Sequence, residues 1–250
     1  MESCELILDL LDEILFPRCC ACCSVEIENG FLCRDCRRGF LQMRPFPAID
    51  FLDGGVSVFS YEREIKQAIH EIKFASDQRR LKQLAGEVEM LMQDVSVQNI
   101  IIKFSTDAGN LPLHDEHNNN CTVTSGPQRS SGCPIWCGVP TDPSRLRKRG
   151  FDIPSTLFSE RAKEFGGIWK PVLCRTRKTL PMYGLKPEER VRNLKDCFAV
   201  TGDVGGKSVI LVDDIFTTGT TFSAAAAALK KAGASSVKGL AFCSSLENLR

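Results

Sequence analysis

The fold of this chain is indicated by residues 209–221, which read VILVDDIFTTGTT. The first four residues of this stretch are apolar and mostly β-branched, which is typical of a buried parallel strand. Asp213 and Asp214 follow at the carboxyl end of that strand, where open α/β sheets bind ligands. Residues 222–232 are rich in alanine and precede Gly233, which predicts a helix with a left-handed C-cap. The stretch therefore predicts an α/β fold with a ligand site between this strand and this helix.

The turn between the strand and the helix has the composition of a phosphate site. Its hydroxyl residues surround Gly219 and are Thr217, Thr218, Thr220 and Thr221. The backbone N–H groups of residues 218–221 can converge on an anion, and the helix dipole adds positive potential there. Glycine admits a backbone conformation that other residues avoid. Ionised carboxylates only accept hydrogen bonds, so Asp213 and Asp214 suit the vicinal hydroxyls of a ribose or a cation. Together these features predict a ribose 5-phosphate site.

Composition limits the other possibilities. The chain has 250 residues, of which 25% are charged and 43% hydrophobic, and its formal net charge is +1. This length accommodates one α/β domain plus a small module, and the near-neutral charge excludes a global attraction to nucleic acid or membranes. No run of about eighteen uninterrupted apolar residues occurs, so we expect no membrane span. Residues 1–16 are amphipathic and acidic, without the basic start of a signal peptide, so we expect a cytoplasmic protein.

Cysteine usage predicts a metal site near the N-terminus. The chain has 13 cysteines, and several of them crowd into residues 19–36 as two Cys-x-x-Cys pairs. Four thiolates in this arrangement suit a closed, structural Zn²⁺ site. The preferred ligands are Cys20, Cys23, Cys33 and Cys36. The alternative register of the first pair uses Cys19 with Cys22, and a redox or metal-sensing role is the alternative to structural zinc.

The remaining patterns divide the chain into two parts. We expect an N-terminal helix and zinc-binding module over residues 1–50 and the main α/β domain over residues 51–250. Residues 103–133 lack an apolar period, which predicts a flexible insert. The other expected elements are helices over residues 3–16, 62–93 and 154–165 and strands over residues 51–61, 100–102 and 134–140.

Clustered basic residues predict a polyanion site. Four cations fall within residues 145–149, which is unfavourable unless an anion lies nearby. Arginine binds paired oxygens in a bidentate manner, so a pyrophosphate fits. The predicted pyrophosphate or polyanion residues are Arg145, Arg149, Gly150 and Lys73. Residues 174–195 are basic and rich in proline and glycine, which predicts a flexible loop that closes over a polyanion or grips a phosphodiester backbone.

Taken in order, these pieces resemble the ComF family of competence and phosphoribosyltransferase-like proteins. Residues 209–221 are similar to the PRPP-binding signature of type I phosphoribosyltransferases, and residues 15–17 before the cysteines are similar to the start of the family's zinc finger. Other positions that match family motifs are Tyr61, Ile69, Lys73, Val139, Arg145, Arg149, Arg190, Asn193 and Phe198. The chain departs from the family at Asp152 and Ile153, where Asn-Gln is usual, and at Met182 in the basic loop.

The resemblance implies a type I phosphoribosyltransferase-like parallel sheet with flanking helices, plus a small zinc-ribbon-like module. It implies a site for PRPP or a ribose 5-phosphate ligand with Mg²⁺, in which Asp213 and Asp214 bind the ribose hydroxyls and residues 217–221 bind the 5-phosphate. In an enzyme, Asp213, Asp214 and Arg149 would be the catalytic residues for phosphoribosyl transfer to an acceptor that the sequence does not identify. The alternative is a non-catalytic competence protein that binds single-stranded DNA during DNA uptake, together with a helicase-like partner.

Overall fold

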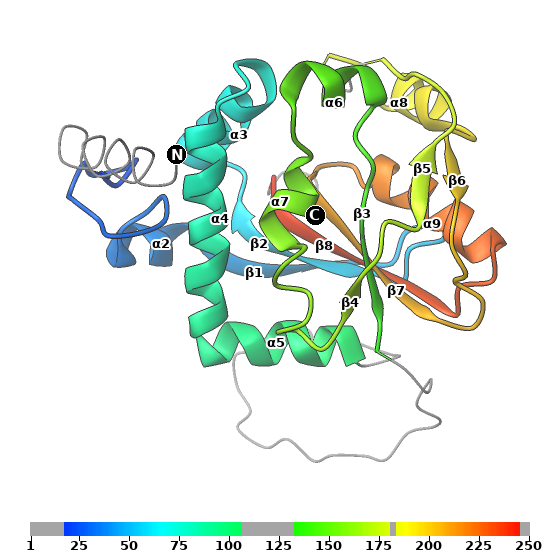
Figure 1. Ribbon diagram of the computed structural model, residues 1–250, viewed down its shortest axis with the longest axis horizontal. Helices are drawn as coiled ribbons and strands as arrows, with labels where there is room; N and C mark the ends of the chain where they lie inside the picture. Colours follow the sequence, from blue (N-terminus) through cyan, green and yellow to red (C-terminus); the bar gives the residue numbers. More distant parts are fainter. Residues whose placement is uncertain (1–17, 107–132, 181–183, 246–250) are drawn as a thin grey trace, which may run out of the picture.

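The computed structural model describes residues 18–106, 133–180 and 184–245 (Figure 1). The expected helix over residues 3–16, most of the insert expected over residues 103–133, and Met182 lie outside the described residues. None of the helices within the described part of the chain is long and apolar enough to cross a membrane.

The centre of the molecule is a mixed α/β arrangement around a mostly parallel sheet. The sheet has six strands in the order β1-β2-β8-β7-β3-β4. Their bounds are β1 (Leu41–Phe46), β2 (Gly55–Ser60), β3 (Ile135–Gly138), β4 (Ile168–Trp169), β7 (Ser208–Phe216) and β8 (Ser236–Ser244). Only the β1–β2 pair is antiparallel, and the other neighbouring strands are parallel. The α/β class predicted from residues 209–221 is therefore confirmed.

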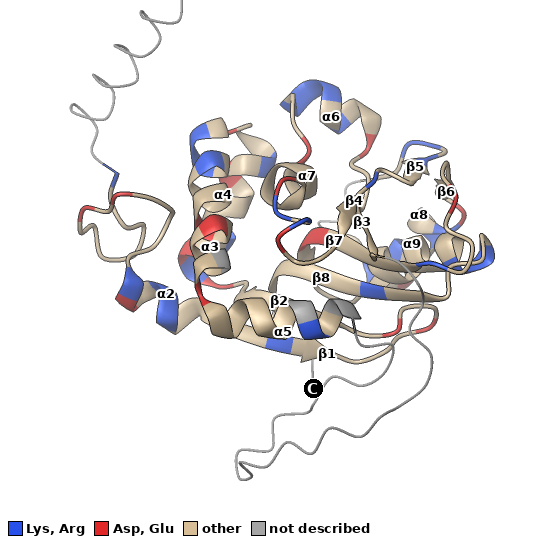
Figure 2. Ribbon diagram, turned by 60° about the horizontal axis from the view of Figure 1, so that its bottom comes forward, with Lys and Arg blue, Asp and Glu red and all other residues tan. Residues whose placement is uncertain are grey.

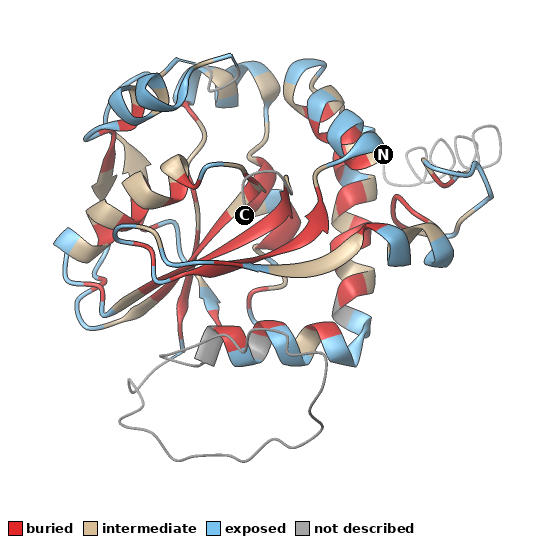
Figure 3. Ribbon diagram, turned by 180° about the vertical axis from the view of Figure 1, so that it is seen from behind, coloured by how far each residue is buried: buried red, intermediate tan, exposed pale blue. Residues whose placement is uncertain are grey.

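The two middle strands are buried on both faces. In β7, Val209 pairs with Val237 of β8 on one side and with Ile135 of β3 on the other. Most apolar residues of β3, β7 and β8 are almost fully shielded from solvent, and Figure 3 shows these strands at the buried centre of the fold. Near-continuous runs of valine, isoleucine and leucine suit this position because both faces of a central parallel strand are covered by helices.

Helices cover the two faces of the sheet. One hydrophobic cluster joins the sheet to α3, α4, α5 and α7, and a second joins it to α9. The bounds are α3 (Arg63–Phe74), α4 (Gln78–Gln93), α5 (Val95–Thr106), α7 (Ile153–Phe158) and α9 (Thr220–Lys231). Helix α9 connects β7 to β8, as the alanine-rich segment predicts.

Three further parts complete the fold. The short helix α6 (Pro143–Arg149) follows β3, and α2 (Arg34–Phe40) follows the cysteine-rich segment. The strands β5 (Leu173–Arg175) and β6 (Phe198–Val200) form an antiparallel pair, with α8 (Pro187–Leu194) between them in sequence. Figure 1 shows β5, β6 and α8 together on one side of the molecule and α2 on the opposite side, beyond α4.

Two of the expected elements are wrong. Residues 100–102 form part of α5, not a strand. Val97, Ile101 and Phe104 are buried at helical spacing whereas Ile100 is 41% exposed, so the apolar period is that of a helix. A run of three isoleucines alone does not distinguish a buried strand from a helix. Residues 187–194, expected within a flexible loop, form α8, which begins with proline in its first turn, a favoured position.

Two other helices have different bounds from those expected. The helical pattern over residues 62–93 is broken into α3 and α4. Ser76 has a positive φ of 57° and the Asp77 side chain accepts the Arg80 N–H at 2.9 Å, which ends one helix and caps the next. Helix α7 ends at Phe158, and turns replace helix up to Gly166.

Candidate functional site

The predicted phosphate turn lies between the carboxyl end of β7 and the first turn of α9. Gly219 has a φ of 72° and is the N-cap residue of α9, without a side-chain hydrogen bond at the cap. A Cβ atom at this position would lie 2.1 Å from Ile49 Cδ1. Thr218 Oγ1 and Thr220 Oγ1 are 2.8 Å apart. The turn therefore has the left-handed glycine, the clustered hydroxyls and the helix N-terminus that an anion site requires.

Asp213 and Asp214 lie near the end of β7, immediately before this turn, but their environments differ. Asp214 is 7% exposed, and its two carboxylate oxygens lie 3.0 Å (Oδ1) and 2.9 Å (Oδ2) from Lys73 Nζ at the end of α3. Asp213 is partly exposed, and its Oδ1 accepts the backbone N–H of Asp214 at 2.9 Å. Asp214 is thus in an ion pair, whereas Asp213 forms no ion pair with the residues that the structure describes and retains access to solvent.

Burial and the neighbouring charges shift the pKa values of two of these groups, Lys73 and Asp213. Burial lowers the pKa of Lys73, but Asp214 and Asp213 more than offset this, so the pKa of Lys73 is raised and the ammonium stays charged. Burial and the neighbouring charge of Asp214 raise the pKa of Asp213 well above its usual value. Asp213 therefore favours its neutral form more than a free carboxyl group does, and a cation bound beside it would favour the ionised form.

The basic cluster of residues 145–149 forms most of α6, above the acidic segment of β7 in Figure 2. The helix ends at Gly150, which has a left-handed φ of 84°. Arg149 Nε is buried and has no hydrogen-bond partner among the described residues. Burial lowers the pKa of Arg149, while the charges of Asp214 and Asp152 act in the opposite direction. An unpartnered buried guanidinium N–H is unfavourable, so this nitrogen lacks the hydrogen-bond acceptor that a bound anion would supply.

Arg145 takes part in a network that sequence reasoning missed. Its Nη2 donates to the carbonyl oxygen and to Oγ1 of Thr179, both at 3.1 Å. Arg175 Nη1 donates to the same hydroxyl at 2.9 Å and its Nε donates to the Pro140 carbonyl at 2.7 Å. These bonds attach the start of the basic segment of residues 174–195 to α6 and to the loop after β3.

Asp142 completes this network. Its Oδ2 accepts the backbone N–H of Thr179 at 3.1 Å, and its Oδ1 accepts the backbone N–H and hydroxyl of Ser144. Burial would raise the pKa of Asp142, but these hydrogen bonds and Arg145 lower it to about 2. The Asp-Pro start of α6 was a usable signal for an N-cap, but nothing local indicates a contact with a residue 37 positions away.

A cavity beside the phosphate turn does not contain the aspartates. It has a volume of about 1120 Å³ and lies between α8, α9 and the loop after β1. Thr218, Gly219 and Thr220 lie at its edge, and its other lining residues are mostly apolar. Because neither Asp213 nor Asp214 lines it, this groove adjoins the phosphate turn without being the predicted ribose site.

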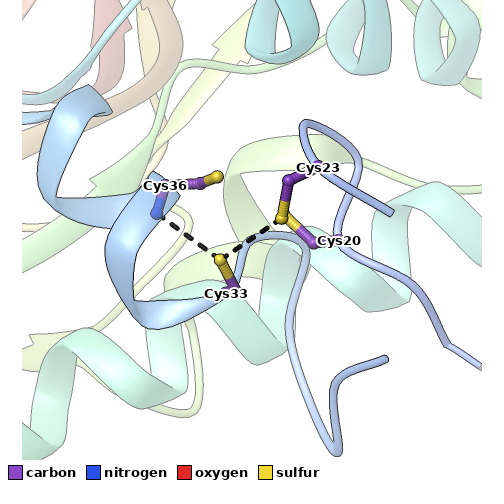
Figure 4. A group of neighbouring side chains, drawn as sticks. All are labelled: Cys20, Cys23, Cys33 and Cys36. Carbon is purple, nitrogen blue, oxygen red and sulfur yellow. Dashed lines mark hydrogen bonds between the residues drawn. The ribbon is translucent and has the colours of Figure 1, made fainter. Parts of the chain in front are cut away.

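The four cysteines preferred from the sequence as zinc ligands lie together in the structure. The sulfur atoms of Cys20, Cys23, Cys33 and Cys36 all lie within 4.8 Å of one another, and they point toward a common centre (Figure 4). The Cys23 and Cys33 sulfurs are 3.7 Å apart, which is close to the edge of about 3.8 Å of a tetrahedron with Zn–S bonds of about 2.3 Å. Cys19 and Cys22 are exposed and outside this group. The cluster can hold a metal ion such as zinc.

A buried carboxylate connects the cysteine-rich segment to α4. Glu87 of α4 is fully buried, and its Oε2 accepts the backbone N–H groups of Phe31 and Leu32 at 2.9 and 3.1 Å. Its other oxygen pairs with Arg37 Nε of α2. A Cβ on Gly86 would lie 2.4 Å from Asn29 Oδ1. The cysteine segment therefore packs closely against α4.

Comparisons with known proteins agree with this geometry. Residues 182–248 match the family model described as phosphoribosyl transferase domain, and this range includes β7, the phosphate turn, α9 and β8. The chain is 29% identical over 192 residues to the DNA utilization protein YhgH of Salmonella typhi. The aligned region covers 76% of this chain and 72% of that protein.

Solved structures give weaker matches. The allosteric regulatory enzyme of purine biosynthesis aligns with 58% of this chain and 24% of its own, at 18% identity and a TM-score of 0.30. A hypoxanthine phosphoribosyl transferase from Trypanosoma cruzi aligns with 66% of this chain and 69% of its own, at 12% identity and a TM-score of 0.35.

The sequence relationship and the family model, together with the cysteine cluster, confirm the predicted resemblance to the ComF family. The chain is similar in sequence to the DNA utilization protein YhgH, and it combines an N-terminal cysteine cluster with a segment, residues 182–248, that matches the phosphoribosyl transferase domain model.

Proposed function

We propose that the chain binds PRPP, or another ligand that ends in ribose 5-phosphate, at the carboxyl end of β7. The observation that carries the proposal is the left-handed Gly219, which caps α9 five residues after Asp214 at the end of β7. Hydroxyl groups and free first-turn N–H groups suit the 5-phosphate, and carboxylates suit the ribose hydroxyls. The match to the phosphoribosyl transferase family model over this segment gives independent support.

The basic groups near this edge suit the second phosphate group of such a ligand. Arg149 has a buried Nε that lacks a partner within the described residues, and Arg145 and the left-handed Gly150 lie on the same helix and its cap. We propose that Arg149 binds the pyrophosphate, with Arg145 and Gly150 beside it. In a transfer reaction the pyrophosphate would be the leaving group, and Arg149 would stabilise the charge that develops on it.

Two metal ions have different roles in this proposal. Mg²⁺ typically binds substrate phosphates with one or two carboxylates, so it would arrive with PRPP and neutralise its phosphate charge. Zn²⁺ would occupy the cysteine cluster as a structural ion, because four thiolates leave no open coordination position. We expect both to operate in the cytoplasm, where the thiolates stay reduced.

A thermal-shift titration tests the ligand proposal. We expect Mg-PRPP to raise the melting temperature of the wild type, because a ligand that binds only the folded state stabilises it. The double variant Asp213→Ala with Asp214→Ala should lose this shift. Asp203→Ala is the matched control, since Asp203 lies at the opposite end of β7 with a side chain 79% exposed. If the double variant showed the same rise in melting temperature as Asp203→Ala, the proposed site would be contradicted. A separate assay for pyrophosphate release with added nucleobases would test phosphoribosyl transfer.

Binding of single-stranded DNA is the second candidate function. The homologues are called DNA utilization proteins, and α6 ends with Arg147, Lys148 and Arg149 in its last turn. Fluorescence anisotropy with a labelled oligonucleotide at increasing salt would test it, because phosphate contacts make affinity fall steeply with ionic strength. Affinity that does not change with salt would contradict this candidate. The helicase-like partner that the family resemblance implies would be tested by co-purification.

A further inference from the structure

The end of β7 carries a charge arrangement that a simple pair of ribose-binding aspartates does not explain. Both oxygens of Asp214 lie within 3.0 Å of Lys73 Nζ. The Asp214 side chain is 9% exposed and that of Lys73 is 28% exposed, so the pair is largely shielded from water. A shielded pair is screened much less than a surface pair. Asp214 therefore has a protein cation on both oxygens before any ligand arrives.

A second cation acts on the same carboxylate. The charge of Asp214 influences the pKa of Arg149, which places the guanidinium within the electrostatic reach of Asp214. A divalent ion bound directly to Asp214 would be repelled by both Lys73 and Arg149.

Asp213 is in a different position. It is partly exposed, and its Oδ1 accepts the Asp214 backbone N–H. One carboxylate is sufficient for Mg²⁺ when the substrate supplies phosphate oxygens. The two aspartates thus differ in their availability to a ligand, although they are adjacent in sequence.

We propose that Lys73 is the resident counter-ion of Asp214, that it fixes this carboxylate and keeps metal ions from it, and that Asp213 alone contacts the ribose or a ligand-borne Mg²⁺. This inference rests on the proposed phosphoribosyl site and replaces the pyrophosphate role predicted for Lys73 from the sequence. Lys73 and Asp214 are then positioning residues, and Asp213 is the ligand-contacting residue.

Titration of the zinc-loaded full chain with Mn²⁺ alone tests the role of Lys73. We expect Lys73→Gln to bind Mn²⁺ about tenfold more tightly than the wild type, because the substitution exposes Asp214 to the metal. The gain should disappear in Lys73→Gln with Asp214→Asn. Lys73→Arg keeps the charge and should behave like the wild type. Equal Mn²⁺ affinities of wild type and Lys73→Gln would overturn the proposal.

Stability provides a second measurement if Lys73→Gln folds poorly. Removing one partner of a shielded ion pair leaves an uncompensated charge, so the single variant should be less stable. The double variant, with two neutral amides, should recover part of the loss in urea unfolding. A double variant that is no more stable than Lys73→Gln would overturn the proposal.

Calorimetric titration with PRPP separates this inference from the proposed function. We expect Asp213→Asn to weaken PRPP binding about tenfold more than Asp214→Asn does. Equal losses would contradict the division of roles. Absence of PRPP binding in the wild type and every variant would contradict the proposed function, whereas the Mn²⁺ comparison would still decide the role of Lys73.

Discussion

The cysteine cluster and the phosphate turn are both sites for charged ligands, but they are built differently. The four clustered cysteines come from one short segment, which runs from Cys20 to Cys36. The edge of β7 combines side chains from α3, α6 and β7, and its Lys73–Asp214 contact joins residues 141 positions apart. A local site is complete when its own segment folds, whereas the edge exists only when the whole sheet is formed.

Metal removal should give the largest effect and test the first half of this comparison. The apparent binding energy of structural zinc is roughly 10 kcal/mol or more and is also folding energy. We expect chelation, or Cys33→Ala with Cys36→Ala, to unfold the cysteine segment and lower the melting temperature of the chain. Metal analysis should find one zinc per wild-type chain. Cys22→Ala, an exposed cysteine outside the cluster, is the control and should retain the zinc.

The next effect concerns the connection between the cysteine segment and α4. We expect Glu87→Gln to reduce the free energy of unfolding by about 3 kcal/mol, because it removes a buried charge that pairs with Arg37 and accepts two backbone N–H groups. Urea unfolding would measure it. Glu89→Gln, on the same helix, removes only a surface pair with Arg161 and should cost less than about 1 kcal/mol. Equal losses of unfolding free energy in Glu87→Gln and Glu89→Gln would show that Glu87 does not connect the cysteine segment to α4.

At the edge of the sheet, Asp142 should make stability depend on pH. Its pKa of about 2 in the folded chain lies below the ordinary value of 3.8. Its contribution, about 2 kcal/mol, is therefore fully present above pH 4 or so and is lost as the pH falls toward about 2. The stability difference between wild type and Asp142→Asn should shrink over this range. A difference that is independent of pH would contradict the hydrogen-bond network around Thr179.

The smallest expected effect concerns the turn itself. Gly219→Ala should weaken PRPP binding by about tenfold or more, because alanine is strained at this φ and its Cβ would meet Ile49. Gly206 has a similar φ of 65° but open space around it. Gly206→Ala should therefore cost stability without changing PRPP affinity. If both variants bound PRPP as the wild type does, the turn would not be the phosphate site.

Much of the fold was predictable where the signal is local. The run of apolar residues in β7, the glycine of the turn and the alanines of α9 each follow a short-range rule, and the structure has them in this order. The spacing of the cysteines also predicted a cluster of four thiolates, although it left the register of the first pair open, and the structure brings Cys20, Cys23, Cys33 and Cys36 together. Such features require only the propensity or reach of a few neighbouring residues.

What could not be predicted depends on long-range contacts. Ile101 is buried in a helix because α5 packs on the sheet, but a run of isoleucines fits a strand equally well. The pairing of Lys73 with Asp214 and of Thr179 with Asp142 requires the strand order, which the sequence does not give directly. The two aspartates therefore looked equivalent in sequence, although their surroundings differ.

The most direct test of the proposed phosphoribosyl site is calorimetric titration of the wild-type chain with Mg-PRPP, ribose 5-phosphate and pyrophosphate in turn. If the turn after β7 binds the 5-phosphate and α6 binds the pyrophosphate, PRPP should bind with one site per chain and more tightly than either fragment. Absence of heat with PRPP, or pyrophosphate binding as tightly as PRPP, would contradict a phosphoribosyl site at this edge.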